Sequence, residues 1–110
     1  MPTPGTVVTI EFSGAHKTQI RPAVVVSTDV YHSNRPDVIL AVITKEIDQA
    51  TTPTDYVLQD WQAAGLHLPS GFRAFLETHP ATRIARVIGR IFDRDWKEVQ
   101  ARLLLAIAVT

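Results

Sequence analysis

The sequence predicts a mainly β, α+β fold, a small antiparallel barrel closed at one end by a C-terminal α-helix. Five or six short segments rich in β-branched residues follow one another, and only the last segment has a clear helical period. No stretch alternates strands with long helices, so a βαβ unit is not expected. The 110 residues are predicted to form one domain spanning 1–110.

The first half of the chain supplies three of the expected strands. Residues 6–12 alternate apolar and polar side chains, which is the pattern of a half-buried strand. The runs 23–26 and 38–43 are dominated by β-branched residues and predict strands buried on both faces. Residues 13–20 are expected to form a polar hairpin loop, and residues 28–37 an irregular connection.

The second half supplies three more strands, at residues 56–58, 71–78 and 84–91. Residues 45–54 are irregular, with room for one helical turn. A further helical turn over 60–64 is expected to end at Gly65 as a left-handed cap. Gly89, inside a strand, indicates a bulge or a close approach of another backbone.

The C-terminal helix is the clearest element. Its apolar residues recur at steps of four and three and form one stripe, made of Phe92, Trp96, Val99, Leu103 and Ile107. Asp93 is the expected N-cap. Charges on the polar face are spaced for i,i+4 pairs, which are Asp93–Lys97, Arg94–Glu98 and Glu98–Arg102. Leu104 and Leu105 fall partly outside the stripe and indicate either a second contact surface or a wide apolar edge.

The composition is that of a globular protein, with 45% hydrophobic and 20% charged residues and no cysteine. A disulfide framework and a thiolate metal site are therefore excluded. The 11 basic and 11 acidic residues balance, which argues against a large duplex-binding surface but leaves room for a local basic groove. The N-terminus does not have the pattern of a signal peptide, and the apolar runs are too short to cross a membrane. A cytoplasmic protein is expected.

Two places in the sequence indicate chemistry. Arg21 and Pro22 stand where the polar loop meets the run 23–26, so the proline and the strand behind it fix the backbone of the arginine. Thr44 follows the run 38–43 directly, which holds its hydroxyl on a rigid strand end. Taken alone, each is more simply explained as the polar end of a strand.

The surroundings of these two places resemble the MazF/PemK toxins of bacterial type II toxin–antitoxin modules. The most characteristic motif is Arg21-Pro22-Ala23, followed by aliphatic residues and Ser27. Other segments fit the family in order and spacing, and these are residues 4–12, 40–44, 61–70 and 88–99. The resemblance spans residues 4–109, essentially the whole chain.

Three departures from the family pattern concern the expected groove. Residues 18–20, Thr-Gln-Ile, stand where the family often carries a glycine and a basic pair. Lys45 replaces a frequent serine after the strand-end threonine, and Gly71 and Phe72 replace two aliphatics before Arg73. The groove lining, and with it the preference for an RNA sequence, is expected to differ from that of other members.

The resemblance implies an SH3-like barrel with a terminal helix, a homodimer, and cleavage of single-stranded RNA without a metal or other cofactor. It implies catalytic roles for Arg21 and Thr44, with Ser70 and Arg73 near the RNA. It also implies a cognate antitoxin, whose acidic segment is expected to face Arg21, Lys17 and Arg73.

The chemistry of such a cleavage can be stated independently. The 2′-hydroxyl of RNA attacks the adjacent phosphorus, and an enzyme must stabilise the extra charge on the phosphorane. The guanidinium of Arg21 offers a fork of donors for phosphate oxygens, and Thr44 offers a further donor. Arginine stays protonated and is a poor base. His16 would suit that role, although a solvated loop histidine is the favoured interpretation.

The residues predicted to bind RNA are Lys17, His16, Ser70, Arg73 and Phe72. Bases outside a duplex need stacking partners, and the candidates are Tyr31, Trp61, Phe72 and Phe75. Phe72 and Phe75 point to opposite faces of their strand, so only one of them is expected to be exposed. The four histidines lack the spacing of a metal site, and none is expected.

Two other functions stay open from the sequence. A topoisomerase-poisoning toxin of the CcdB type would share the barrel, but its helix ends in Trp-Gly-Ile, whereas this chain ends Ala-Ile-Ala-Val-Thr. A non-catalytic SH3-like binding module is the other alternative. The presence of both Arg21 and Thr44 weakens it.

Overall fold

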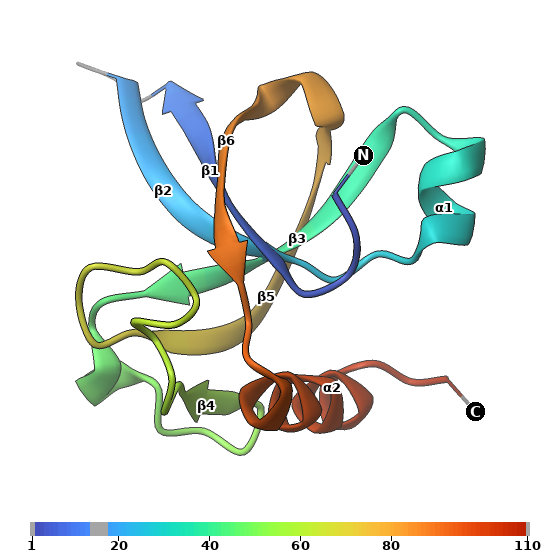
Figure 1. Cartoon of the computed structure of the whole chain (residues 1–110). Helices are drawn as coiled ribbons and strands as arrows, with labels where there is room; N and C mark the ends of the chain where they lie inside the picture. Colours follow the sequence, from blue (N-terminus) through green and yellow to red (C-terminus); the bar gives the residue numbers. More distant parts are fainter. Residues whose placement is uncertain (1, 14–17, 110) are drawn as a thin grey trace.

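In the computed structural model, which describes residues 2–13 and 18–109, six antiparallel strands form one curved sheet (Figure 1). The strands are β1 (Thr6–Ser13), β2 (Thr18–Val25), β3 (Asp37–Thr44), β4 (Asp55–Val57), β5 (Gly71–Pro80) and β6 (Ile84–Arg90). Their order across the sheet is β4-β5-β3-β2-β1-β6. The prediction of a mainly β fold with α+β character and a C-terminal helix is confirmed.

Two helices accompany the sheet. The longer one, α2 (Asp93–Ala106), packs against β4 and β5 at one end of the sheet (Figure 1). The short α1 (Asp29–Asn34) connects β2 to β3, and single 3-10 turns stand at Ile47–Gln49 and Ala81–Arg83. Within the described ranges, no helix has the length and apolar character needed to cross a membrane.

The strand β2 begins earlier than the sequence indicates. Residues 18–20, expected in a polar loop, continue the strand and pair with residues 11–13 of β1. The ladder hydrogen bonds of this hairpin outweigh the weak strand preference of the side chains, because strand propensity depends strongly on context. Farther along β2, Ala23, Val24 and Val25 are all buried, as predicted.

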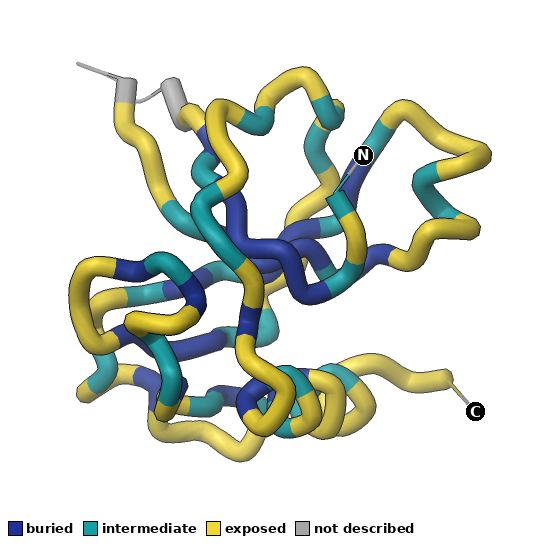
Figure 2. The backbone as a smooth tube through the Cα atoms, viewed as in Figure 1, coloured by how far each residue is buried: buried dark blue, intermediate teal, exposed yellow. Residues whose placement is uncertain are grey.

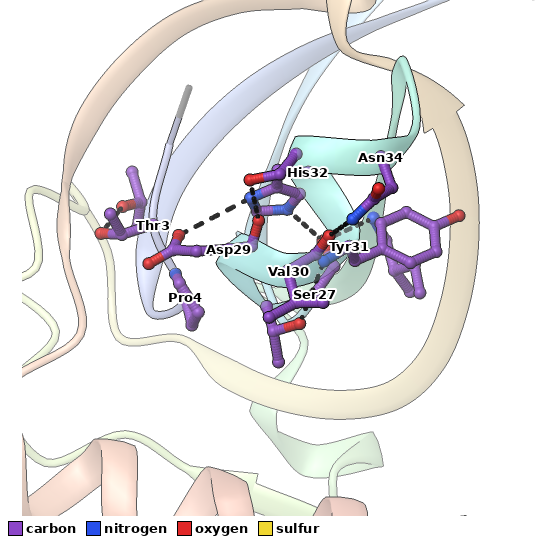
Figure 3. Close-up of polar contacts among 12 residues, drawn as sticks. Thr3, Pro4, Ser27, Asp29, Val30, Tyr31, His32 and Asn34 are labelled. Atoms are coloured by element: carbon purple, nitrogen blue, oxygen red, sulfur yellow. Dashed lines mark hydrogen bonds and ion pairs between the residues drawn. The ribbon is translucent and has the colours of Figure 1, made fainter.

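The sequence predicts an irregular connection at residues 28–37, but the structure has α1 there. The hydroxyl of Thr28 caps this helix by accepting the backbone N–H of Tyr31 at 3.3 Å. At the other end, the side chain of Asn34 donates to the carbonyl of Val30 at 2.8 Å (Figure 3). Polar residues that are typical of turns therefore serve as helix caps here, and their composition alone does not distinguish the two uses.

The middle of the sheet is buried on both faces (Figure 2). Alternate residues of a strand point to opposite faces, so Val7 and Val24 belong to one core cluster and Val8 and Val25 to the other. The larger cluster also contains Phe72, from β5, and lies under α2. This double burial explains why the runs in β2 and β3 are almost continuously apolar.

The predicted apolar stripe of α2 is confirmed only in its middle. Val99 is fully buried, and Trp96 and Leu103 pack against the same core cluster. Phe92 and Ile107 are 55% and 41% exposed. They flank the helix as its two caps, and so they lie beyond the turns that cover the core.

The polar residues of α2 also differ in part from the prediction. The helix begins at Asp93, which therefore is not the N-cap. Arg94 binds Asp60 with two bonds of 2.6 and 2.8 Å instead of pairing with Glu98. The predicted pair of Glu98 with Arg102 is confirmed at 2.7 Å. The tertiary partner of Arg94 offers a two-bond geometry that the helical neighbour does not match.

A buried carboxylate, Asp95, ties α2 to the loop after β4. It accepts the hydroxyl of Tyr56 at 2.6 Å and the backbone N–H groups of Gln59 and Asp60 at 3.1 and 2.8 Å. Burial, together with the hydrogen bond to Asp95, raises the pKa of Tyr56 to about 12. The phenol therefore remains a donor at neutral pH, and the start of the loop is held against the first turn of the helix.

Two glycines hold the middle of the same loop against β6. Gly65 has a φ of 88°, and a Cβ there would lie 2.0 Å from the carbonyl oxygen of Ile88. Gly89 lies opposite, where a Cβ would come 2.1 Å from the carbonyl oxygen of Ala64. The predicted left-handed cap at Gly65 and the predicted close approach at Gly89 are the same contact, between the loop and β6.

Candidate functional site

A cleft of about 780 Å³ opens between the ends of β2 and β3 and the loop at residues 66–70. A smaller cavity of about 160 Å³ shares several of its residues and lies along β2 and β3. The polar residues of the larger cleft are Thr9, Gln19, Arg21, Thr44, Lys45, Glu46, His67 and Ser70. Both residues predicted to be catalytic, Arg21 and Thr44, line both spaces.

The strand register brings these two residues together. Ala23 pairs with Val42 across β2 and β3, and in an antiparallel pair each step back on one strand matches a step forward on the other. Arg21 lies two residues before Ala23 and Thr44 lies two residues after Val42, so both stand at the same end of this strand pair and line the same cleft. The apolar runs that bury the middle of each strand thus determine where the two polar ends meet.

The Arg21 side chain is exposed and has a partner on its own strand. Its Nε and Nη2 both donate to the side-chain oxygen of Gln19, at 3.3 and 3.0 Å. Gln19 stands two residues earlier on β2, so its side chain leaves the same face. One edge of the guanidinium fork is therefore held within the cleft.

The hydroxyl of Thr44 is oriented by the turn that follows β3. Its oxygen accepts the backbone N–H of Glu46 at 3.0 Å. A threonine hydroxyl has one hydrogen and two acceptor positions. With an N–H already bound at the oxygen, the hydroxyl hydrogen is available for an acceptor other than that backbone group. This geometry suits a donor to an anionic oxygen in the cleft.

The loop at residues 66–70 forms the opposite wall. His67 is exposed on it, whereas Ser70 is only 4% exposed and donates its hydroxyl hydrogen to the carbonyl of Leu68 at 2.7 Å. Ser70 therefore lies at the cleft, as predicted, but its hydroxyl hydrogen is used within the loop. His67, Lys45 and Glu46 are the further ionisable side chains that line the cleft.

Two residues predicted to contact RNA do not face this cleft. Phe72 has 0% exposure and belongs to the core, so it cannot stack on a base, and that prediction is wrong. Phe75 is the exposed one of the pair, at 54%. Arg73 turns toward β4, where its Nε binds Asp55 at 3.2 Å and its guanidinium lies 4.4 Å from the ring centre of Phe75. The strand pairing of β4 with β5 gives Arg73 this nearer, buried partner.

The remaining predicted contacts, His16 and Lys17, lie outside the described residues. Among the described residues of the cleft there is no Phe, Tyr or Trp, so His67 supplies its aromatic ring. The sequence indicates Lys45 and the segment that contains Gln19 only as departures in the expected groove, and it does not indicate Glu46 or His67 as site residues. Recognising residues 18–20 as strand would have indicated Gln19, because it is then two positions from Arg21 on one face.

Ser27, His32 and Asp29 form a second polar group, at the start of α1 (Figure 3). The Ser27 hydroxyl is hydrogen-bonded to Nε2 of His32, and Nδ1 of His32 is 3.9 Å from Asp29. Ser27 is only 4% exposed, and its oxygen also accepts the backbone N–H of Ile39 at 3.0 Å. The group therefore joins α1 to β3, and its serine is shielded from any substrate.

Metal binding finds no support in residues 2–13 and 18–109, where no cluster of three or more His, Asp or Glu side chains could hold an ion. The cleft instead presents two cationic side chains, Arg21 and Lys45, beside the Thr44 hydroxyl. Such a set binds anionic oxygens through hydrogen bonds and charge.

Comparison with known proteins identifies the family. The family model of the PemK-like, MazF-like toxins of type II toxin–antitoxin systems matches residues 3–107. The chain therefore belongs to this toxin family. Comparison of the sequence with curated proteins gives no match.

Solved structures share the fold at low sequence identity. An endoribonuclease in complex with its cognate antitoxin, from a mycobacterial species, has a TM-score of 0.82 and 18% identity, covering 100% of this chain and 98% of the other. A MazE-MazF structure from Deinococcus radiodurans has a TM-score of 0.74 at 17% identity, with coverage of 97% and 98%. The Mycobacterium tuberculosis toxin MazF-mt6 has a TM-score of 0.73 at 17% identity, with coverage of 92% and 94%.

Proposed function

We propose that this protein is a metal-independent endoribonuclease that cleaves single-stranded RNA, the toxin of a type II toxin–antitoxin pair. The observation that supports this most directly is that Arg21 and Thr44 line the same cleft. The family match and the likeness to structures named as endoribonucleases support it independently. No feature of the described residues favours a gyrase-poisoning toxin or a non-catalytic module.

In the proposed reaction the 2′-hydroxyl attacks the adjacent phosphorus, and the bond from phosphorus to the 5′-oxygen breaks. Arg21 binds the phosphate oxygens and stabilises the charge that builds up on the phosphorane. Thr44 donates a further hydrogen bond to the same oxygens. The leaving 5′-oxygen takes a proton from water or from the group that accepted the 2′-hydroxyl proton. The products are a cyclic phosphate and a 5′-hydroxyl, and their formation requires no metal-bound water.

The 2′-hydroxyl must lose its proton during this attack. Within the described cleft, His67 and Glu46 are the side chains whose ordinary chemistry suits a proton acceptor. His16, outside the described residues, stays the candidate predicted from the sequence. Lys45 and Lys17 are proposed to bind neighbouring phosphates, and Ser70 to contact the RNA through its oxygen.

The test is incubation of the purified protein with a long unstructured RNA in the presence of EDTA, followed by mapping of the cut ends. We expect cuts that leave a 5′-hydroxyl and a cyclic phosphate. An Arg21→Ala preparation, purified in the same way, controls for contaminating nucleases. RNA that stays intact, or that is cut equally by both preparations, would reject the proposal.

We further propose that the protein is a homodimer in the cytoplasm. Leu104 and Leu105, both 67% exposed on α2, offer apolar surface beyond the core. A groove shared by two copies would also gather basic side chains from both, which offsets the neutral net charge of one chain. Light scattering at micromolar concentration should report twice the mass of the chain, and a monomer would contradict the assembly.

Inhibition by a cognate antitoxin is proposed on the same grounds. Related structures are named as complexes with an antitoxin or with MazE. An acidic segment dotted with apolar residues would compete with RNA for Arg21, and its ordering on binding would keep the complex reversible. Expression of this chain alone should arrest growth, and co-expression with the neighbouring open reading frame should restore it.

A further inference from the structure

Gln19 lies two residues before the proposed catalytic arginine, on the same strand β2. Both Gln19 and Arg21 line the cleft and are exposed. The glutamine oxygen accepts two hydrogen bonds from Arg21, from Nε at 3.3 Å and from Nη2 at 3.0 Å.

We propose that Gln19 is a positioning residue, which holds the Arg21 guanidinium in the orientation that receives the scissile phosphate. This inference rests on the proposed RNA cleavage. An amide oxygen has two acceptor positions, so one glutamine satisfies both donors on one edge of the fork. Two bonds to one side chain restrict the rotamers of the guanidinium, and this lowers the entropy that is lost when it binds a phosphate in one geometry.

Gln19 binds one edge of the guanidinium. The fork carries five N–H groups, and Gln19 binds two of them. A phosphate is a charged acceptor and makes stronger hydrogen bonds with arginine than a neutral amide does. The amide nitrogen of Gln19 is itself a donor, and so it is compatible with an anion nearby. A carboxylate at the same place would hold Arg21 equally well but would repel the phosphate.

Two substitutions separate these effects. Gln19→Met keeps the length of the side chain but removes the acceptor, and it should lower kcat/KM by roughly five- to tenfold, the scale of one net hydrogen bond. Gln19→Glu keeps the two bonds to Arg21 and adds a negative charge, so it should weaken RNA binding more than Gln19→Met does. Gln100→Met makes the same change on the exposed face of α2, away from the cleft, and should behave as the wild type.

The first measurement does not require cleavage. The Nε–H resonance of Arg21, assigned with Arg21→Lys, should show slower exchange with water in the wild type and in Gln19→Glu than in Gln19→Met. The second is the affinity for an RNA analogue with a 2′-deoxy nucleotide at the cut site. In an Arg21→Ala background, Gln19→Met should cause no further loss of affinity, because Gln19 acts through Arg21.

The outcomes distinguish this inference from the proposed function. An unchanged Arg21 resonance in Gln19→Met, or an equal loss of affinity with and without Arg21, would overturn the positioning role while leaving RNA cleavage intact. If the wild-type protein does not cleave RNA, the proposed function is rejected. If its Arg21 resonance still depends on Gln19, the contact between the two side chains is retained. Wild-type activity and resonance in both Gln19 variants would overturn the inference alone.

Discussion

The hydroxyl of Tyr56 donates to the carboxylate of Asp95 at 2.6 Å, and this bond joins β4 to the first turn of α2. Asp95 is 1% exposed and receives two backbone N–H groups as well. A buried charge is tolerated only when such donors surround it. Helix and sheet are therefore connected by polar bonds in addition to the apolar contact of Val99 with the core.

Removing this hydroxyl should destabilise the protein without unfolding it. Tyr56→Phe keeps the ring but deletes one donor to a buried charge, which should lower the free energy of unfolding by about 1.5–3 kcal/mol. Urea denaturation followed by circular dichroism measures the change. Tyr31→Phe, on α1, is the matched control and should change stability little. Equal stability of Tyr56→Phe and the wild type would show that Asp95 does not depend on this donor.

Substitution of Arg21 tests the site directly. Arg21→Ala should reduce the rate of RNA cleavage by roughly a hundredfold or more, the scale of losing one preorganised charge-stabilising donor. The fold should survive, because the side chain is exposed. Arg21→Lys should restore little, since a point charge does not reproduce the fork. Arg83→Ala removes an exposed arginine outside the cleft and should leave the rate unchanged.

Thr44 should matter less than Arg21, because it supplies a neutral donor. Thr44→Val keeps the shape of the side chain and removes the hydroxyl, so cleavage should slow by roughly tenfold or more. Thr44→Ser keeps the hydroxyl and should retain most of the activity. Single-turnover cleavage of a defined oligonucleotide separates the chemical step from binding. If Thr44→Val and Thr44→Ser cut at the same rate, the hydroxyl has no role.

The contact of Gly89 with the loop should not admit a side chain. Gly89→Ala would set a Cβ 2.1 Å from the carbonyl oxygen of Ala64, so the loop or β6 must move. We expect a loss of about 3 kcal/mol, the upper end of the usual cost of overpacking. Ala85→Ser, on the exposed part of the same strand, is the control. Denaturant midpoints measure both, and a stable Gly89→Ala would argue against the close contact.

Acid should weaken the pairing of Asp55 with Arg73. Burial raises the pKa of the Asp55 carboxyl, but hydrogen bonds from Thr52 and Arg73 outweigh it, and the net pKa is lowered. The resulting stabilisation is present above the unfolded pKa of about 3.9 and is lost as the pH falls through the lower folded value. The stability difference between wild type and Asp55→Asn should therefore shrink below about pH 4. The exposed Asp48→Asn is the control, and a difference that stays constant with pH would contradict the assignment.

Much of the fold could be predicted because the central strands β2 and β3 are buried on both faces in their middle parts. Continuous β-branched runs such as those ending at Val25 and Ile43 indicate strands directly. The same runs pair with each other, and Arg21 and Thr44 lie just beyond them at the same end of the strand pair. The burial patterns locate both strand ends, but the prediction that Arg21 and Thr44 share one site comes from the family resemblance.

The predictions from the sequence are wrong where tertiary contacts determine which side chains are exposed and which partners they bind. Phe72 is buried and Phe75 is exposed because only one face of β5 is covered. The sequence of the strand does not indicate which face that is. Arg73 follows the family pattern, yet Asp55 on the neighbouring β4 binds it. The exposed ends of α2 and the extra residues of β2 likewise depend on what they pack against or pair with. Periodicity in the sequence identifies a helix or strand, but the elements that pack against it determine which of its side chains are exposed to solvent.

The loop that forms one wall of the cleft contains no helix or strand, so residues outside the loop hold it in position. The segment from Gln59 to Ser70 is clamped at one end by Asp95 and in its middle by the paired glycines of the loop and β6. The sheet forms one wall of the cleft, and the opposite wall is attached to the terminal helix through Asp95. Substitutions that destabilise α2 should therefore widen the cleft and lower the sequence specificity of the proposed RNA cleavage. The pairing of the strands that carry Arg21 and Thr44 should be retained.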